Sequence, residues 1–140
     1  MKISIIGAGY VGLTGACFAN FDNEVVLIGR SQERADQINS GKSPIYEPGL
    51  DEIIKKNLEK KKLRATLDYK EIRNSDVVML AVGTPSRDDG SIDLSQIESA
   101  SKSLGEELKQ TEKFITVVVK STVIPGTTKD FIKPIIEKAS

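Results

Sequence analysis

The chain has 140 residues, of which 39% are hydrophobic and 29% charged, the balance of a soluble globular domain rather than a disordered or membrane protein. Lys and Arg together number 20, as do Asp and Glu, so the net charge is zero, which argues against a nucleic-acid partner because that needs a basic surplus. The absence of His and the single Cys exclude Ser-His and Cys-His dyads, His-based metal sites and internal disulfides, and we expect no metal.

The first half of the chain alternates short apolar runs with segments of helical character. Apolar runs at residues 2–6 and 24–28 each stop at a glycine, which is typical of buried strands. Small and apolar residues over 10–20 suit a buried helix, and Ser31 can cap another helix that runs to about Ser40. A turn-rich loop at 44–49, an amphipathic helix at 50–62, a short strand at 63–66 and a helical turn at 68–73 follow.

The second half carries two strong strand signals, at residues 76–82 and 114–119. Asp93 can cap a helix over 94–108 between them, and a last helix is expected over 127–138. Strands that read as continuous apolar runs and alternate with helices predict a parallel sheet covered on both faces. Right-handed crossovers then predict one doubly wound, Rossmann-like α/β domain over residues 1–140, with strand order 3-2-1-4-5.

The apolar N-terminal stretch superficially suggests a signal peptide. Glycines interrupt it, however, and Lys2 alone is a weak positive region. No run of 18 apolar residues follows, so we expect a cytoplasmic protein without a membrane partner.

Residues 7–12, Gly-Ala-Gly-Tyr-Val-Gly, match the GxGxxG pattern directly after the first expected strand. Gly7 permits a tight turn, Gly9 lets a pyrophosphate approach the backbone, and Gly12 lets the helix pack closely on the strand. Backbone amides at the start of the helix then face the anion. The strand–loop–helix context disfavours the alternative, a glycine turn that binds nothing.

The second expected strand ends in Gly29-Arg30-Ser31, where a dinucleotide fold usually has Asp or Glu for the ribose 2′-hydroxyl. Gly29 removes the carboxylate that would repel a phosphate, Arg30 offers a planar donor fork, and Ser31 adds a hydroxyl and a helix N-terminal amide. This pattern favours a ribose 2′-phosphate, and hence NADP over NAD. The alternative is a solvated arginine in a surface turn.

Four segments in order carry a wider resemblance: residues 9–13 (GYVGL), 43–50 (SPIYEPGL), 81–85 (AVGTP) and 120–127 (KSTVIPGT). Together they closely resemble the N-terminal dinucleotide-binding domain of the UDP-glucose/GDP-mannose dehydrogenase family, nearest to its UDP-glucose 6-dehydrogenase branch. The resemblance implies an NAD-dependent oxidoreductase, which converts the C6 alcohol of a nucleotide sugar to a carboxylate in two hydride transfers.

The resemblance also implies roles for individual residues. It assigns the pyrophosphate to Val11 and its neighbour Tyr10, and the adenosine ribose to Arg34. It places Val82, Gly83 and Thr84 along the cofactor, and Thr122 near the nicotinamide, where it helps position water. The loop over residues 44–50 matches one near the active-site cleft.

Two departures from the family pattern matter. Gly29 stands where the family has Asp, and the chain ends at Ser140, before the family's catalytic Cys, Lys, Asn and Asp. We therefore expect cofactor binding without turnover, by a monomer or weak dimer. Cys17 is expected to be a core residue and no substitute for the catalytic Cys.

Several interpretations remain open from the residues alone. The chain could be a stand-alone NAD(P)-binding or sensing module, or the cofactor half of another sugar-nucleotide dehydrogenase. Lys120, at the end of the last expected strand, could be functional or could simply extend to solvent. Asp88 and Asp89 fit a polar loop better than a metal pair.

Overall fold

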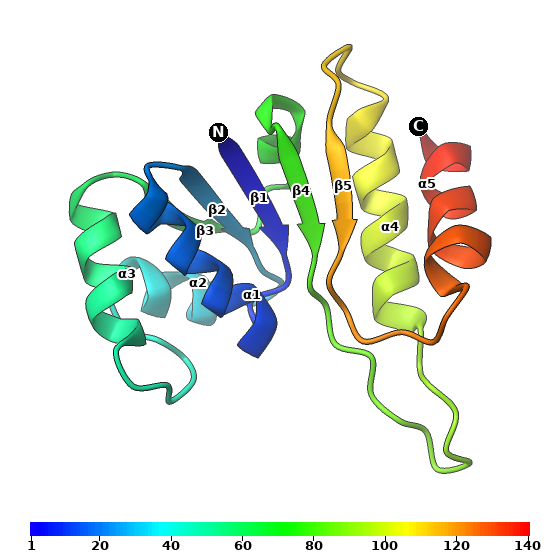
Figure 1. Ribbon diagram of the computed structural model, residues 1–140, viewed down its shortest axis with the longest axis horizontal. Helices are drawn as coiled ribbons and strands as arrows, with labels where there is room; N and C mark the ends of the chain where they lie inside the picture. Colours follow the sequence, from blue (N-terminus) through cyan, green and yellow to red (C-terminus); the bar gives the residue numbers. More distant parts are fainter.

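A five-stranded parallel sheet forms the centre of the computed structural model, which describes all 140 residues (Figure 1). The strands are β1 (Lys2–Ile6), β2 (Glu24–Ile28), β3 (Leu63–Thr66), β4 (Val77–Leu80) and β5 (Thr116–Val119). Their spatial order is β3-β2-β1-β4-β5, and every neighbouring pair is parallel. The expected doubly wound sheet and its strand order are both confirmed.

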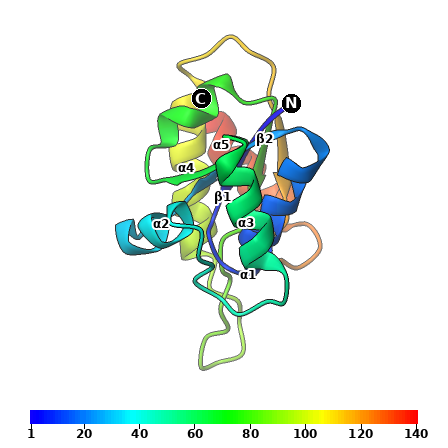
Figure 2. The same ribbon diagram turned by 90° about the vertical axis from the view of Figure 1, so that its left-hand side faces the viewer.

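Helical segments cover both faces of this sheet, as Figures 1 and 2 show. One face carries α1 (Tyr10–Thr14), the 3₁₀ segment η1 (Gly15–Phe21), α2 (Gln32–Asn39) and α3 (Leu50–Glu59). The other carries the 3₁₀ segment η2 (Tyr69–Asn74), α4 (Ser95–Leu108), the π-helical turn η3 (Thr128–Ile132) and α5 (Lys133–Ala139). None of these helices has the length and apolarity needed to cross a bilayer.

Strand pleating divides the core between the two faces. Ile5 and Leu27 belong to the cluster under α1 and α3, whereas Ile6 and Ile28, the next residues along β1 and β2, belong to the cluster under α4. Because all five strands are parallel, their carboxyl ends share one edge of the sheet. The loops that begin at Gly7, Gly29 and Ala81 therefore meet at that edge.

The expected helix over residues 10–20 is only partly correct. It is α-helical to Thr14 and continues as the 3₁₀ segment η1, since glycines at 12 and 15 lower helix propensity. The expectation that Cys17 lies in the core is wrong, because its side chain is only partly buried. The buried stripe of these segments runs through Leu13, Ala16 and Ala19 instead.

The ends of three other elements also differ from expectation. β5 begins at Thr116 rather than Phe114, whose side chain is 89% exposed, and β4 covers only Val77–Leu80. The last helix opens with the π-helical turn η3 before it becomes regular at Lys133. Strand β3 agrees with the expected residues, and Ser31 caps α2 as expected, accepting from the Arg34 amide at 3.3 Å.

Four charged side chains connect the sheet at the edge opposite the carboxyl ends. Arg64 donates to Glu24 at 2.8 Å and to Glu71 at 2.6 Å, and Lys2 donates to Glu71 at 3.0 Å. The network thereby joins β1, β2, β3 and η2. Hydrogen bonding from Arg64, opposed in part by burial and assisted by Lys2, holds the pKa of Glu71 below its usual range.

We expect Glu71→Gln to lower the free energy of unfolding at pH 7 by about 1–2 kcal/mol, or roughly 3–6 °C in melting temperature. A carboxylate whose pKa is lowered by folding stabilises the folded state above its ordinary pKa. That contribution disappears as the pH falls through the lowered value. Thermal melts followed by circular dichroism should therefore show the difference at pH 7 and its loss in acid, below the ordinary pKa of a glutamate.

Glu137→Gln is the matched control, since its carboxylate pairs with Lys133 on an exposed helix surface. Such a pair contributes at most about 0.5 kcal/mol. Equal melting temperatures for the Glu71 variant and the parent at pH 7 would contradict this account of the network.

Candidate dinucleotide-binding site

The loop between β1 and α1 is closely packed at Gly7 and Gly12 and open at Gly9. Gly7 has φ +114°, and a Cβ there would collide with the carbonyl oxygen of Ala81. A Cβ at Gly12 would collide with the carbonyl oxygen of Gly7 itself. Gly9, by contrast, has nothing within 4 Å of the position a Cβ would take. The loop thus presents a bare stretch of backbone to the space beyond the carboxyl edge.

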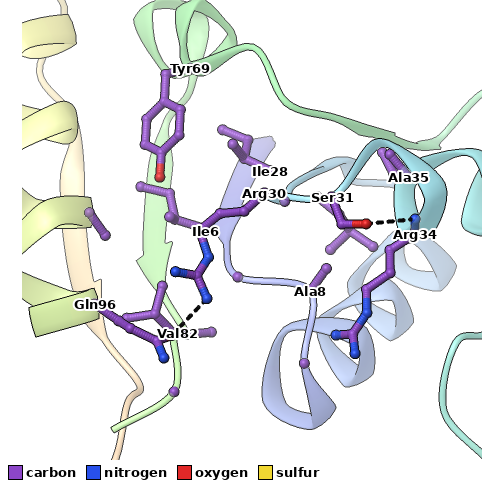
Figure 3. Close-up of a pocket in the computed structure, with 18 of the residues that line it drawn as sticks. Ile6, Ala8, Ile28, Arg30, Ser31, Arg34, Ala35, Tyr69, Val82 and Gln96 are labelled. Carbon is purple, nitrogen blue, oxygen red and sulfur yellow. Dashed lines mark hydrogen bonds between the residues drawn. The ribbon is translucent and has the colours of Figure 1, made fainter. Parts of the chain in front are cut away.

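A cavity of about 450 Å³ lies beside this loop (Figure 3). Its walls come from the ends of β1, β2 and β4, one side of α2, the first turns of α4, and single residues of β3 and η2. It therefore lies between β1 and β4, where the chain changes from one face of the sheet to the other. Ligands of open α/β sheets bind at this switch point.

The charges around the cavity are all of one sign. Arg30 and Arg34 are the only charged side chains that line it, and no carboxylate does. Gly29, at the end of β2, lines it as well, and an ideal Cβ there would lie 3.7 Å from the Cβ of Ala8. The end of β2 is therefore positive, open and free of acid.

The two arginines lie on either side of Ser31 (Figure 3). Ser31 uses its hydroxyl to cap α2, which places Arg34 in the first turn of that helix, near Ala8 of the glycine loop. Arg30 extends the other way, and its Nη2 donates to Oε1 of Gln96 at 3.0 Å. Arg30 is exposed, as the alternative interpretation expects, but its guanidinium is hydrogen-bonded and borders the cavity.

Tyr69 of η2 forms part of the wall beside Arg30 (Figure 3). Burial raises the pKa of the Tyr69 phenol above its ordinary value, and the charge of Arg30 opposes this shift. The phenol is therefore neutral at physiological pH, and it adds an aromatic surface and one hydroxyl to the cavity.

The structure brings most of the sequence-predicted residues to this edge, but not all of them into the cavity. Gly7, Gly9, Gly29, Arg30, Ser31, Arg34, Val82 and Gly83 line it. Gly12 is buried beneath the loop, whereas Tyr10 and Val11 are exposed at the start of α1 and do not line the cavity.

Thr84 and Thr122 lie next to each other beyond the ends of β4 and β5. The Thr84 hydroxyl donates to the backbone oxygen of Thr122 at 2.6 Å. Neither lines the cavity. The loop over residues 43–49 and the start of α3 border a second, separate hollow of about 460 Å³, in which Tyr46 is largely exposed.

Sequence reasoning named only eight of the 20 lining residues, and those it missed include Tyr69, Gln96, Ser99 and Ala100. The last three lie in the first turns of α4, the helix that follows β4. The rule that ligands bind at the switch point indicated that region, although no motif marks the individual residues. Nothing in the sequence around Tyr69 distinguishes it from an ordinary tyrosine.

A glycine loop of this geometry, at the carboxyl edge of a 3-2-1-4-5 parallel sheet, defines a dinucleotide-binding Rossmann domain. The family model described as the NAD binding domain of the UDP-glucose/GDP-mannose dehydrogenase family matches residues 1–140. The chain therefore belongs to the UDP-glucose/GDP-mannose dehydrogenase family, as its sequence motifs indicated.

Individual relatives agree with this assignment. A UDP-glucose 6-dehydrogenase from Haloferax volcanii is 48% identical, covering 100% of this chain and 33% of the relative. A GDP-mannose 6-dehydrogenase from Pseudomonas putida is 45% identical, covering 100% of this chain and 32% of the relative. The chain thus spans about a third of the length of the curated relatives it matches.

Solved structures of the family share the fold closely. The GDP-mannose dehydrogenase of Pseudomonas aeruginosa, crystallised as a ternary complex, superposes with a TM-score of 0.97 at 39% identity, covering 100% of this chain and 33% of the other. A UDP-glucose dehydrogenase from Pyrobaculum islandicum gives 0.93 at 34% identity, with 99% and 32% covered. The bare Gly9 backbone and the acid-free cavity fit a nicotinamide dinucleotide.

Substitution by alanine should impair cofactor binding at Gly9 and stability at Gly12. Gly9→Ala places a methyl group in open space on extended backbone, so we expect an almost unchanged melting temperature and about tenfold weaker cofactor binding, or more. Gly12→Ala drives a methyl group into the Gly7 carbonyl and should lower the melting temperature by several degrees. Calorimetric titration and thermal melts separate the two effects. Unchanged cofactor affinity in Gly9→Ala would contradict the proposed position of the pyrophosphate.

Proposed function

We propose that this chain is the cofactor-binding part of a nucleotide-sugar dehydrogenase, and that it binds NADP at least as well as NAD. The observation that carries the cofactor preference is the end of β2. The cavity there is lined by two arginines and a glycine, and by no carboxylate. The free 2′-hydroxyl of NAD is usually bound by a carboxylate at this position, which is missing here.

The charges at the end of β2 favour NADP. A carboxylate at position 29 would accept a hydrogen bond from the 2′-hydroxyl of NAD and would repel a 2′-phosphate. Gly29 does neither, so the NAD-specific contact is lost while the phosphate meets no opposing charge. Arg30 and Arg34 both border the same space and supply charge-assisted donors.

With the 2′-phosphate at the end of β2, each of the other predicted residues takes a place along the cofactor. The backbone of Gly9, Tyr10 and Val11 would face the pyrophosphate, with Gly7 and Gly12 shaping the loop. Val82, Gly83 and Thr84 would lead from the adenosine end towards the nicotinamide, where Thr122 would lie. The hydrogen bond from Thr84 to Thr122 supports this placement, because it holds the two residues together beyond the strand ends.

The bound cofactor would accept hydride from the C6 alcohol of the sugar. Of the relatives described above, the more similar acts on UDP-glucose and the other on GDP-mannose, by their names. We propose UDP-glucose as the substrate of the complete enzyme, with GDP-mannose as the alternative. Comparing the two as substrates of an enzyme with the relatives' full length distinguishes them.

Arg30→Ala tests the proposed cofactor preference. A hydrogen bond to a charged group contributes roughly 1.5–3 kcal/mol before desolvation costs, and about 1.4 kcal/mol corresponds to a factor of ten in affinity. We therefore expect NADP to bind at least as tightly as NAD to the parent chain. The variant should lose about fivefold to tenfold in NADP affinity and less than twofold in NAD affinity. Isothermal titration at fixed ionic strength measures both.

Arg87→Ala is the matched control, since Arg87 is an exposed arginine that does not line the cavity. It should leave both affinities unchanged. Clearly tighter binding of NAD to the parent chain, or an unchanged NADP affinity in Arg30→Ala, would refute the 2′-phosphate interpretation.

A further inference from the structure

Gln96 holds the guanidinium of Arg30 in a defined place. Arg30 leaves the turn after β2, and Gln96 lies in the first turn of α4, on the other side of the cavity (Figure 3). The hydrogen bond of 3.0 Å between them joins residues 66 positions apart in the chain. The arginine side chain is exposed, yet this hydrogen bond directs it across the cavity towards α4.

The acceptor itself is fixed by its surroundings. Asp93 accepts a hydrogen bond from the amide of Ser95 at 2.9 Å, which anchors the start of α4. Gln96 is partly buried, and its Oε1 lies 3.5 Å from the position a Cβ would take at Gly83. A Cβ at position 83 would make ordinary van der Waals contact with this oxygen, so the acceptor lies directly beside the backbone that follows β4.

The chemical type of the acceptor is the informative feature. An amide oxygen orients a guanidinium without cancelling its charge, whereas a carboxylate would orient it and also neutralise it. Since no carboxylate lines the cavity, Arg30 is oriented and keeps its full charge there. Only one of its five N–H donors is used by Gln96, and a bidentate phosphate contact needs two.

Resting on the NADP preference proposed above, we propose that Gln96 is a positioning residue for cofactor selection. Its side-chain oxygen holds Arg30 across the adenosine end of the cavity, so that the remaining donors of the guanidinium are directed at the 2′-phosphate. Arg30 recognises the phosphate, and Gln96 acts through Arg30. Restraining a long side chain before the ligand arrives reduces the ordering cost of binding.

Two substitutions of Gln96 separate orientation from charge. Gln96→Ala releases Arg30, and we expect about threefold to tenfold weaker NADP binding with less than a twofold change for NAD. Gln96→Glu retains an acceptor but adds a negative charge that neutralises Arg30 and repels the phosphate. We expect it to weaken NADP binding more than Gln96→Ala does. Isothermal titration with both cofactors measures these changes, and thermal melts verify that each variant is folded.

The double variant Arg30→Ala/Gln96→Ala shows whether Gln96 acts through the arginine. It should bind NADP as weakly as Arg30→Ala alone, because no guanidinium remains to be oriented. Gln110→Ala removes the same type of side chain from an exposed position beyond the far end of α4, and should change neither affinity.

The outcomes distinguish this inference from the function on which it rests. If Arg30→Ala weakens NADP binding but Gln96→Ala does not, the positioning role is wrong and the cofactor preference stands. If Gln96→Ala weakens both cofactors equally, or if its effect adds fully to that of Arg30→Ala, Gln96 is an ordinary wall residue and the inference is likewise overturned. If Arg30→Ala itself has no effect on NADP, the proposed preference fails, and the inference with it.

Discussion

The close approach of α1 to the end of β1 is the constraint on which the cofactor site depends. A side chain at Gly12 would collide with the Gly7 carbonyl, and one at Gly7 with the Ala81 carbonyl. These contacts fix the loop that follows β1. It lies beside β4, at the point where the chain changes from one face of the sheet to the other. The backbone at Gly9 is therefore held in place while its outer side remains open, which is what an anion needs.

In the proposed function, electrostatics at the end of β2 then decides which cofactor this scaffold favours. The chain as a whole is balanced in charge, yet the cavity is lined by two arginines and no carboxylate. The electrostatic potential of the cavity is therefore set by the few charged residues that line it and not by the net charge of the chain. Gln96 extends the same principle, since a neutral acceptor orients Arg30 and leaves its charge intact.

The sequence predicted the sheet because its strands are continuous apolar runs and because crossovers are right-handed. It also predicted the glycine loop and the acid-free end of β2, since both are local patterns. It did not predict that residues 15–21 are 3₁₀ rather than α, because hydrophobic spacing hardly distinguishes the two forms. Nor did it predict that Tyr69 and Gln96 line the cavity, because tertiary packing alone brings them there.

We propose that the missing carboxylate at position 29 sets the cofactor preference, and Gly29→Asp tests this most directly. The nearest neighbouring atom to a Cβ at that position is 3.7 Å away, so the Cβ of the new side chain makes only an ordinary van der Waals contact. Titrations of NAD and NADP should show the ratio of their affinities shifting towards NAD by about tenfold or more. An unchanged ratio, in a variant that melts like the parent, would contradict the account.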